Sequence, residues 1–146
     1  MQLVIAGKAV KGFTQFGNDL KTFKFRNEVK WLEDLPAEEL AEVMAAAYAV
    51  VYPVFVGNQH LVAMEALQCT VPVIVSAAVR LPELVTEAVL YADPNDFMDI
   101  ADKMMLLFKD EDHRNQLIRN GKGVLQKINP EKSADMLWQC ITASIK

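Results

Sequence analysis

The segment PVFVGNQHLVAMEALQCTVPVIVS, residues 53–76, contains the order of elements that decides the fold. It predicts the end of one strand, a polar loop over residues 57–60, a helix over residues 61–69 and a second strand over residues 71–75. Strand, helix and strand in this order form the repeating unit of a parallel sheet. Glu65 is unusual, because it places a carboxylate among apolar residues of the predicted helix, toward the polar loop.

The same alternation extends in both directions along the chain. Further strands are predicted over residues 2–6, 28–32, 49–53 and 88–91. The first of them is apolar, as expected of a strand buried on both faces. Helices are predicted over residues 10–20, from Pro36, over 81–85, after a cap at Asn95, over 112–127 and over 130–145. We therefore expect one domain, residues 1–146, with an α/β, Rossmann-like, three-layer α/β/α fold around a parallel sheet.

Composition limits the classes of function. The formal net charge of −4 argues against a nucleic-acid surface, and no run of Lys and Arg overrides it. No apolar run approaches the roughly 20 residues of a transmembrane helix, and the N-terminal residues do not resemble a signal peptide. We therefore expect a cytoplasmic protein. Cys69 and Cys140 have no disulfide or metal spacing, and their apolar surroundings predict small core residues.

The loop before the predicted helix at residue 61 is the best candidate for a binding site. In a parallel α/β sheet, ligands bind beyond the carboxyl ends of the strands, where loops lead into helices. The helix beginning near Leu61 directs free N–H groups toward that edge, where they are suited to bind a phosphate. Glu65 lies one turn further and can accept hydrogen bonds from a ribose diol. Alternatively, Glu65 only complements the helix dipole and has no ligand.

Five segments follow one another in an order that resembles a known family. They are LVIAGK (3–8), VKWLEDLPAEELAEVMAAAYAVVYPV (29–54), LVAMEALQCTVPVIVS (61–76), LPELV (81–85) and LYADPNDFMDIADKMMLLFKD (90–110). Together they resemble the C-terminal, nucleotide-sugar-binding domain of GT-B glycosyltransferases of the family 4 type (glycosyl transferases group 1). NPEKSADMLWQCI (129–141) resembles the closing helix of that domain, so that only residues 9–27 are unmatched.

The resemblance implies that this chain is one half of a GT-B fold. In that family an N-terminal domain takes the acceptor, the C-terminal domain holds a nucleoside diphosphate sugar, and the sugar is transferred with retention. No metal is usual, so we expect no cofactor beyond the donor substrate. We expect a fragment that lacks the acceptor domain and the first strand–helix unit. The isolated chain should therefore not transfer sugar.

The family's hallmark is a Glu-x7-Glu motif, and this chain matches it only in part. Glu65 matches the second glutamate, which holds the ribose hydroxyls, and the backbone N–H groups of Leu61 and Val62 match those that meet the diphosphate. The first glutamate would fall at Gly57 and is absent. The following positions are Asn58, Gln59 and His60, whose side chains can hydrogen-bond sugar hydroxyls but supply no carboxylate. The catalytic residue is therefore unassigned: no side chain is a convincing nucleophile, His60 is the only one with plausible geometry, and a backbone carbonyl of the other domain is the alternative that the resemblance implies.

The same resemblance implies roles for further residues of the donor site and for one helix end. Gly7 and Lys8 match a strand end at the cleft, where Lys8 either approaches a phosphate or base or is simply exposed. Leu35 matches the place where the family packs the nucleobase. Thr70 stands where the family often ends the helix with glycine. The acidic residues 110–112 lie between two predicted helices, so we assign them to a helix cap and not to a metal.

Three other functions are alternatives to the donor-binding part of a glycosyltransferase. A degenerate, catalytically silent binding domain of the same fold is the main alternative, because Gly57 replaces the glutamate near the donor sugar. An NAD-binding unit is disfavoured, because no Gly-x-Gly-x-x-Gly follows a strand. A receiver-type signalling domain is disfavoured, because the first strand does not end in an acidic cluster.

Overall fold

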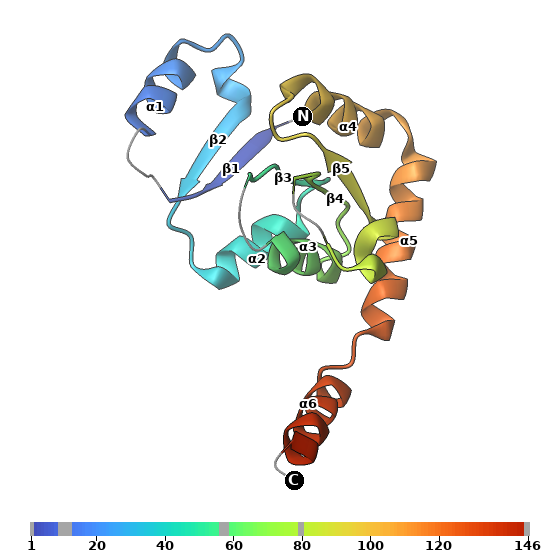
Figure 1. Cartoon of the computed structure of the whole chain (residues 1–146). Coiled ribbons are helices and arrows are strands. Elements are labelled where there is room, and N and C mark those ends of the chain that lie inside the picture. The colour runs from blue at the N-terminus through green and yellow to red at the C-terminus, as the bar shows by residue number, and fades with distance from the viewer. Residues whose placement is uncertain (1, 9–12, 56–58, 79–80, 145–146) are drawn as a thin grey trace. The chain divides into compact units, whose positions relative to one another are not determined.

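The computed structural model in Figure 1 describes residues 2–8, 13–55, 59–78 and 81–144. The chain divides into two compact units, residues 1–43 and residues 44–146. All strand pairs are parallel, as the sequence predicts, but their hydrogen bonds form two sheets, β1–β2 in the first unit and β3–β4–β5 in the second.

The first unit is built on strands β1 (Leu3–Gly7) and β2 (Val29–Glu33), which pair from Leu3 with Val29 to Gly7 with Glu33. They are connected by helix α1 (Phe13–Thr22) and the 3-10 turn η1 (Arg26–Glu28). The ring of Phe16 on α1 lies 6.2 Å from the ring of Trp31 on β2. This contact joins the connecting helix to the strand that follows it.

Strand β1 is less buried than its apolar sequence predicts. Leu3 and Val4 are 44% and 39% exposed, and Ile5 is half-buried. The expectation of a strand buried on both faces is therefore wrong for β1. A continuous apolar sequence indicates a strand that can be covered on both faces, but the covering depends on neighbours that the strand itself does not specify.

The second unit contains the main core. Its sheet has the order β3 (Val50–Tyr52), β4 (Val73–Ser76) and β5 (Val89–Ala92). The central strand β4 is buried throughout. Its alternate side chains enter two separate clusters: Val73 and Val75 pack with α3, η2 and α5, whereas Ile74 packs with Leu107 and Leu117. Because helices cover both faces of β4, this unit has the predicted three-layer α/β/α architecture.

The helices that follow begin and end close to the predicted positions. Helix α2 (Ala37–Ala45) crosses the division between the two units and contributes buried Met44 to the second. Helix α3 (Gln59–Gln68) precedes β4, and the predicted short helix near residue 81 is the 3-10 helix η2 (Glu83–Ala88). Helix α3 begins at Gln59, so the last two residues of the predicted polar loop form its first turn. The half-buried Cys69 packs against the core beside α3, as predicted.

Thr70 reverses the chain between α3 and β4. Its φ is +63°, which is a left-handed conformation that a β-branched residue rarely adopts. The N–H of Thr70 donates to Leu67 O at 2.9 Å, and the N–H of Val71 donates to Ala66 O at 3.0 Å. This is the hydrogen-bond pattern that a glycine usually makes at a helix end, so Thr70 occupies the glycine position without changing the turn.

Helix α4 (Phe97–Lys109) is capped by a different residue from the one predicted. The carboxylate of Asp96 accepts hydrogen bonds from the N–H groups of Met98 and Asp99, whereas Asn95 was expected to cap the helix. Asn95 instead donates from its backbone and side-chain nitrogens to Asp93. Asn and Asp are equally suited to an N-cap, so the sequence alone cannot separate two adjacent candidates.

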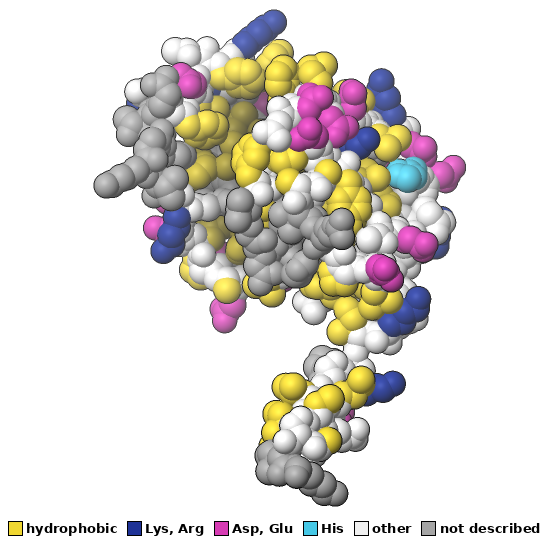
Figure 2. All heavy atoms as spheres, viewed as in Figure 1, with side chains coloured by type: hydrophobic (Ala, Val, Ile, Leu, Met, Phe, Trp, Pro, Cys, Tyr) yellow, Lys and Arg dark blue, Asp and Glu magenta, His cyan; other side chains and the backbone are white. Residues whose placement is uncertain are grey.

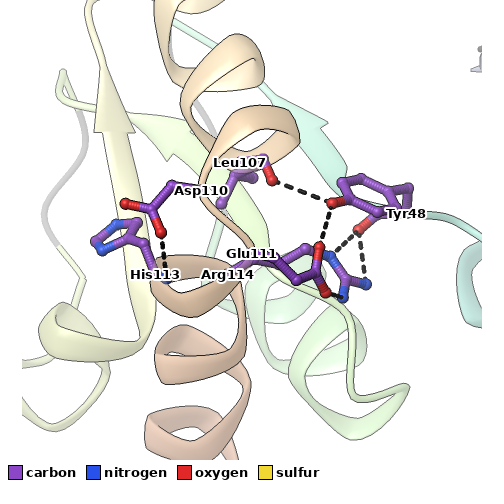
Figure 3. A network of polar contacts seen from close by, with 6 residues as sticks. All are labelled: Tyr48, Leu107, Asp110, Glu111, His113 and Arg114. Carbon is purple, nitrogen blue, oxygen red and sulfur yellow. Dashed lines mark hydrogen bonds and ion pairs between the residues drawn. The ribbon is translucent and has the colours of Figure 1, made fainter.

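A polar network joins helix α5 (Glu111–Lys127) to Tyr48, two residues before β3 (Figure 3). Tyr48 Oη donates to Glu111 Oε2 at 2.7 Å and to Leu107 O at 3.2 Å. The Arg114 guanidinium lies over the Tyr48 ring and donates to Tyr48 O. At the same corner Asp110 accepts from the N–H of His113 at 2.8 Å, which confirms the predicted capping role for the acidic segment.

Helix α6 (Pro130–Ser144) is exposed at every residue whose side chain the structure describes. Hydrophobic side chains are visible on its surface in Figure 2. The exposed hydrophobic residues of this helix include Leu137, Trp138 and Ile141. The prediction that Cys140 is a core residue is wrong, because it is exposed on this helix. Among the described residues, no helix is both long and apolar enough to cross a bilayer.

Candidate donor site

A hollow of about 270 Å³ lies in the first unit, at the carboxyl ends of β1 and β2. Its lining consists of Ala6, Gly7, Lys8, Asp34, Leu35 and Leu40. The parallel pairing explains this placement, because Gly7 and Glu33 are paired and the residues that follow both strands emerge at the same edge. Leu40 reaches the hollow from the first turns of α2.

Asp34 shapes the polar rim of this hollow. Its φ is +51°, a left-handed conformation that Asp tolerates better than most residues. Its N–H donates to Gly7 O at 3.4 Å, and its carboxylate lies 3.4 Å from Lys8 Nζ. Both side chains of this ion pair are more than half exposed, so the pair contributes little to stability and Lys8 can exchange Asp34 for another anion.

The floor of the hollow is apolar, since Leu35 and Leu40 are both half-buried there. A Cβ placed on Gly7 would meet no other atom within 4 Å, so the space over this glycine is open. An apolar floor beside one exposed cation suits a ligand with a flat ring and an anionic group.

The predicted ribose ligand, Glu65, lies in the second unit on α3. The helix is fixed by Ala63, Ala66 and Leu67, which are buried in the core. Glu65 itself is half-buried and makes no ion pair or side-chain hydrogen bond with the residues that the structure describes. Leu61 is 61% exposed at the amino-terminal end of the helix, and Val62 packs against the core.

The structure thus brings some of the predicted residues together. Gly7, Lys8 and Leu35 line one hollow, although they are far apart in the sequence. Leu61, Val62 and Glu65 share α3. Gly57 and Asn58 lie outside the described residues, and Gln59 and His60 are described only as the first backbone turn of α3.

The sequence analysis missed three residues that line the hollow, Ala6, Asp34 and Leu40. A usable signal existed for Asp34, because an aspartate directly after a strand is typical of a left-handed turn residue. Ala6 and Leu40 belong to regular elements, and their position at the hollow depends on how β1, β2 and α2 pack together.

Comparison with known proteins identifies a family for most of the chain. Residues 1–124 match the family model of the glycosyl transferases group 1. The chain is 37% identical over 98 residues to the O-antigen chain mannosyltransferase B of Escherichia coli. This alignment covers 67% of the chain but 25% of the mannosyltransferase, so the chain spans about a quarter of its curated relative.

Solved structures share the fold. The chain superposes on sucrose-phosphate synthase from Thermosynechococcus elongatus with a TM-score of 0.82 at 24% identity, covering 98% of the chain and 39% of that protein. For Anabaena HepE in complex with UDP and glucose, the TM-score is 0.79 at 18% identity, covering 97% and 40%. For the C-terminal domain of the group 1 protein LpcC from Francisella tularensis, it is 0.74 at 23% identity, covering 86% and 68%. The chain therefore belongs to the glycosyl transferases group 1 family, as a GT-B domain of the family 4 type.

Proposed function

We propose that this chain is the nucleotide-sugar-binding part of a retaining glycosyltransferase, which transfers a sugar from a nucleoside diphosphate sugar to an acceptor. The acceptor would be held by a separate N-terminal domain, as in the GT-B architecture. The observation that carries the proposal is the hollow at the ends of β1 and β2, where Gly7, Lys8 and Leu35 meet. The nucleobase would lie on Leu35 and Leu40, with Lys8 close to an anionic group of the donor.

Helix α3, considered by itself, also has features suited to a nucleotide sugar. The N–H groups of its first turn have no partner within the helix and are suited to a diphosphate. Glu65 lies further along this helix, and its carboxylate makes no polar contact with the described residues that would compete with a ribose diol. Anabaena HepE, which shares the fold, has been crystallised with UDP-glucose, and this supports a nucleotide sugar as the class of ligand.

The proposed reaction needs charge stabilisation on the departing nucleoside diphosphate. Helix N–H groups, which the helix fixes before the charge develops, can supply it together with the positive charge of Lys8, without a metal ion. No side chain is assigned as a nucleophile. Since acceptor positioning would come from another domain, we expect the chain alone to bind the donor and not to turn it over.

Calorimetric titration of the chain with UDP, GDP and ADP tests this proposal. We expect at least one of them to bind, and the substitution Leu35→Arg should weaken that binding about tenfold or more by filling the apolar floor. Leu3→Arg is the matched control, because Leu3 is an exposed leucine at the other end of β1. Equal affinities for Leu35→Arg and the control would contradict the assignment of the hollow.

A catalytically silent binding domain of the same fold is the second candidate, because Gly57 stands where the family has a glutamate near the donor sugar. Both candidates bind a nucleotide, so titration does not separate them. Adding the N-terminal acceptor domain separates them. If the chain is part of an active enzyme, sugar is then transferred; if it is a silent domain, the donor binds but no sugar is transferred.

A further inference from the structure

The hollow at the ends of β1 and β2 has a carboxylate at its rim. Of the described residues that line it, Asp34 alone is acidic, Lys8 alone is basic, and the others are small or apolar. Its volume of about 270 Å³ lies just below the roughly 300–1,000 Å³ of pockets that enclose a whole small molecule. The hollow can therefore take one flat ring system, and Asp34 is the lining residue that can accept hydrogen bonds from ring N–H groups through its side chain.

The backbone fixes Asp34 between the two strands. Its φ of +51° is left-handed, and its N–H donates to Gly7 O at 3.4 Å, at the end of β1. Asp34 itself directly follows the last residue of β2. Asparagine tolerates the same left-handed conformation, so the turn by itself does not require a carboxylate.

The carboxylate of Asp34 has unused hydrogen-bonding capacity. Its Oδ1 lies 3.4 Å from Lys8 Nζ, and this is the only polar contact that the side chain makes with the described residues. The side chain is 59% exposed, so the ion pair contributes little to stability and can open. An ionised carboxylate accepts hydrogen bonds at both oxygens, and it can take two parallel N–H groups at once.

The common nucleobases differ in the donors that their Watson–Crick edges offer to such a carboxylate. Guanine presents two adjacent donors, N1–H and the N2 amino group. Uracil presents N3–H between two carbonyl oxygens, whereas adenine and cytosine each present one amino group beside the lone pair of a ring nitrogen. Guanine therefore satisfies both oxygens of a carboxylate, whereas each of the other bases places a lone pair against one of them.

We propose that Asp34 selects guanine, so that the donor of this chain is a GDP-sugar. The inference rests on the proposed function, which places a nucleobase on Leu35 and Leu40. The two carboxylate oxygens of Asp34 accept from guanine N1–H and from the N2 amino group, while Lys8 leaves the ion pair for an anionic group of the donor. Asp34 thereby determines which base is held and takes no part in the transfer of the sugar.

Calorimetric titration of the unaltered chain with GDP, IDP, UDP and ADP tests the selection. IDP is GDP without the N2 amino group, so it keeps N1–H and loses one of the two hydrogen bonds. Because a hydrogen bond to a charged group changes affinity about tenfold or more, we expect GDP to bind at least about tenfold more tightly than each of the other three.

The outcomes of this titration separate the base selection from the proposed function. If UDP, ADP or IDP binds as tightly as GDP, the selection of guanine is overturned and the proposed function stands. If none of the four diphosphates binds, both are overturned. The comparison uses no substitution, so it does not depend on the folding of a variant.

The substitution Asp34→Asn tests whether Asp34 is the group responsible. The amide keeps the left-handed turn but offers one acceptor and an NH₂ donor that opposes the N2 amino group of guanine. GDP affinity should therefore fall by more than IDP affinity, and the ratio of the two dissociation constants should fall to near one. Equal losses of affinity for GDP and IDP would overturn the assignment, because a merely structural Asp34 affects both alike.

Glu33→Gln is the matched control for this substitution. Glu33 is the exposed glutamate directly before Asp34, and it does not line the hollow. This variant should keep the preference for GDP over IDP, and circular dichroism confirms that both variants are folded. Loss of the preference in Glu33→Gln as well would show that removal of any nearby negative charge is sufficient, and would overturn the assignment to Asp34.

Discussion

At the scale of single residues, the family resemblance selects Gly7, Lys8 and Leu35, and the structure places all three in the lining of one hollow. Their role in binding the donor stays a prediction. The N-cap of α4 shows the limit: Asn95 and Asp96 are adjacent and equally able to cap, and the choice depends on side-chain geometry. The exposure of Cys140 was missed for a related reason, because an apolar pattern shows which face of a helix can be buried, not whether anything covers it.

Replacing Glu65 with glutamine separates its two possible roles. If Glu65 binds a ribose diol, Glu65→Gln should lower nucleotide affinity about tenfold with little change in melting temperature, because the shape is kept and the charge is lost. Glu83→Gln, an exposed glutamate of η2, is the control for charge removal. A lower melting temperature with unchanged affinity would instead assign Glu65 to the helix dipole.

Asp99 gives the chain a specific sensitivity to acid. The N–H of Asp93, which donates to Asp99 Oδ2 at 2.8 Å, is the main cause that holds the pKa of this carboxyl below its ordinary value. Partial desolvation opposes that effect, and Lys103 adds to it. Because the folded pKa is lowered, the stabilisation is present above the unfolded pKa and is lost as the pH falls through the folded one.

In the Asp99→Asn variant, the urea concentration at the unfolding midpoint should therefore fall less steeply as the pH is lowered from about 5 to about 2. Asp102→Asn is the matched control, because Asp102 is an exposed aspartate of the same helix with no ion pair among the described residues. Identical acid limbs for the two variants would contradict this account of Asp99.

At the scale of elements, the types and order of the helices and strands follow from the sequence, since β-branched runs and helical periodicity are strong local signals. The boundary of α3 at Gln59 and the 3-10 geometry of η2 do not, because element ends depend on hydrogen bonds that several residue types can make. Thr70 shows that tertiary packing can impose a left-handed turn on a residue that disfavours it.

The contact between α3 and α5 gives a test at this scale. A Cβ added to Gly121 would lie 2.7 Å from Cδ2 of Leu67, which is itself buried, whereas a Cβ on Gly123 would meet nothing within 4 Å. Gly121→Ala should therefore lower the free energy of unfolding, because an overpacking cost of about 1–3 kcal/mol exceeds a helix-propensity gain of up to about 1 kcal/mol. Gly123→Ala should raise it by up to about 1 kcal/mol through helix propensity. Urea denaturation measures both, and stabilisation by Gly121→Ala would contradict the close packing.

At the scale of the whole molecule, the three-layer core of the second unit could be predicted, because alternating strands and helices admit few arrangements. The family followed from the resemblance of the ordered segments and not from this alternation. The division into two sheets and the exposure of β1 could not be predicted, since pairing and burial are set by neighbours far apart in the sequence. The proposed function rests on the least local feature of all, the hollow that the ends of β1 and β2 and the start of α2 form together.

The most direct test of the central claim is a two-dimensional NMR titration of the isotope-labelled chain with the nucleoside diphosphate that binds best. We expect the backbone amide signals of Gly7, Lys8, Asp34 and Leu35 to shift with a common dissociation constant, because these residues line the proposed base site. The signal of Leu3, at the other end of β1, should stay unchanged. Saturable binding that leaves the four hollow signals in place, or no binding by any nucleoside diphosphate, would contradict the claim that this chain holds a nucleotide-sugar donor.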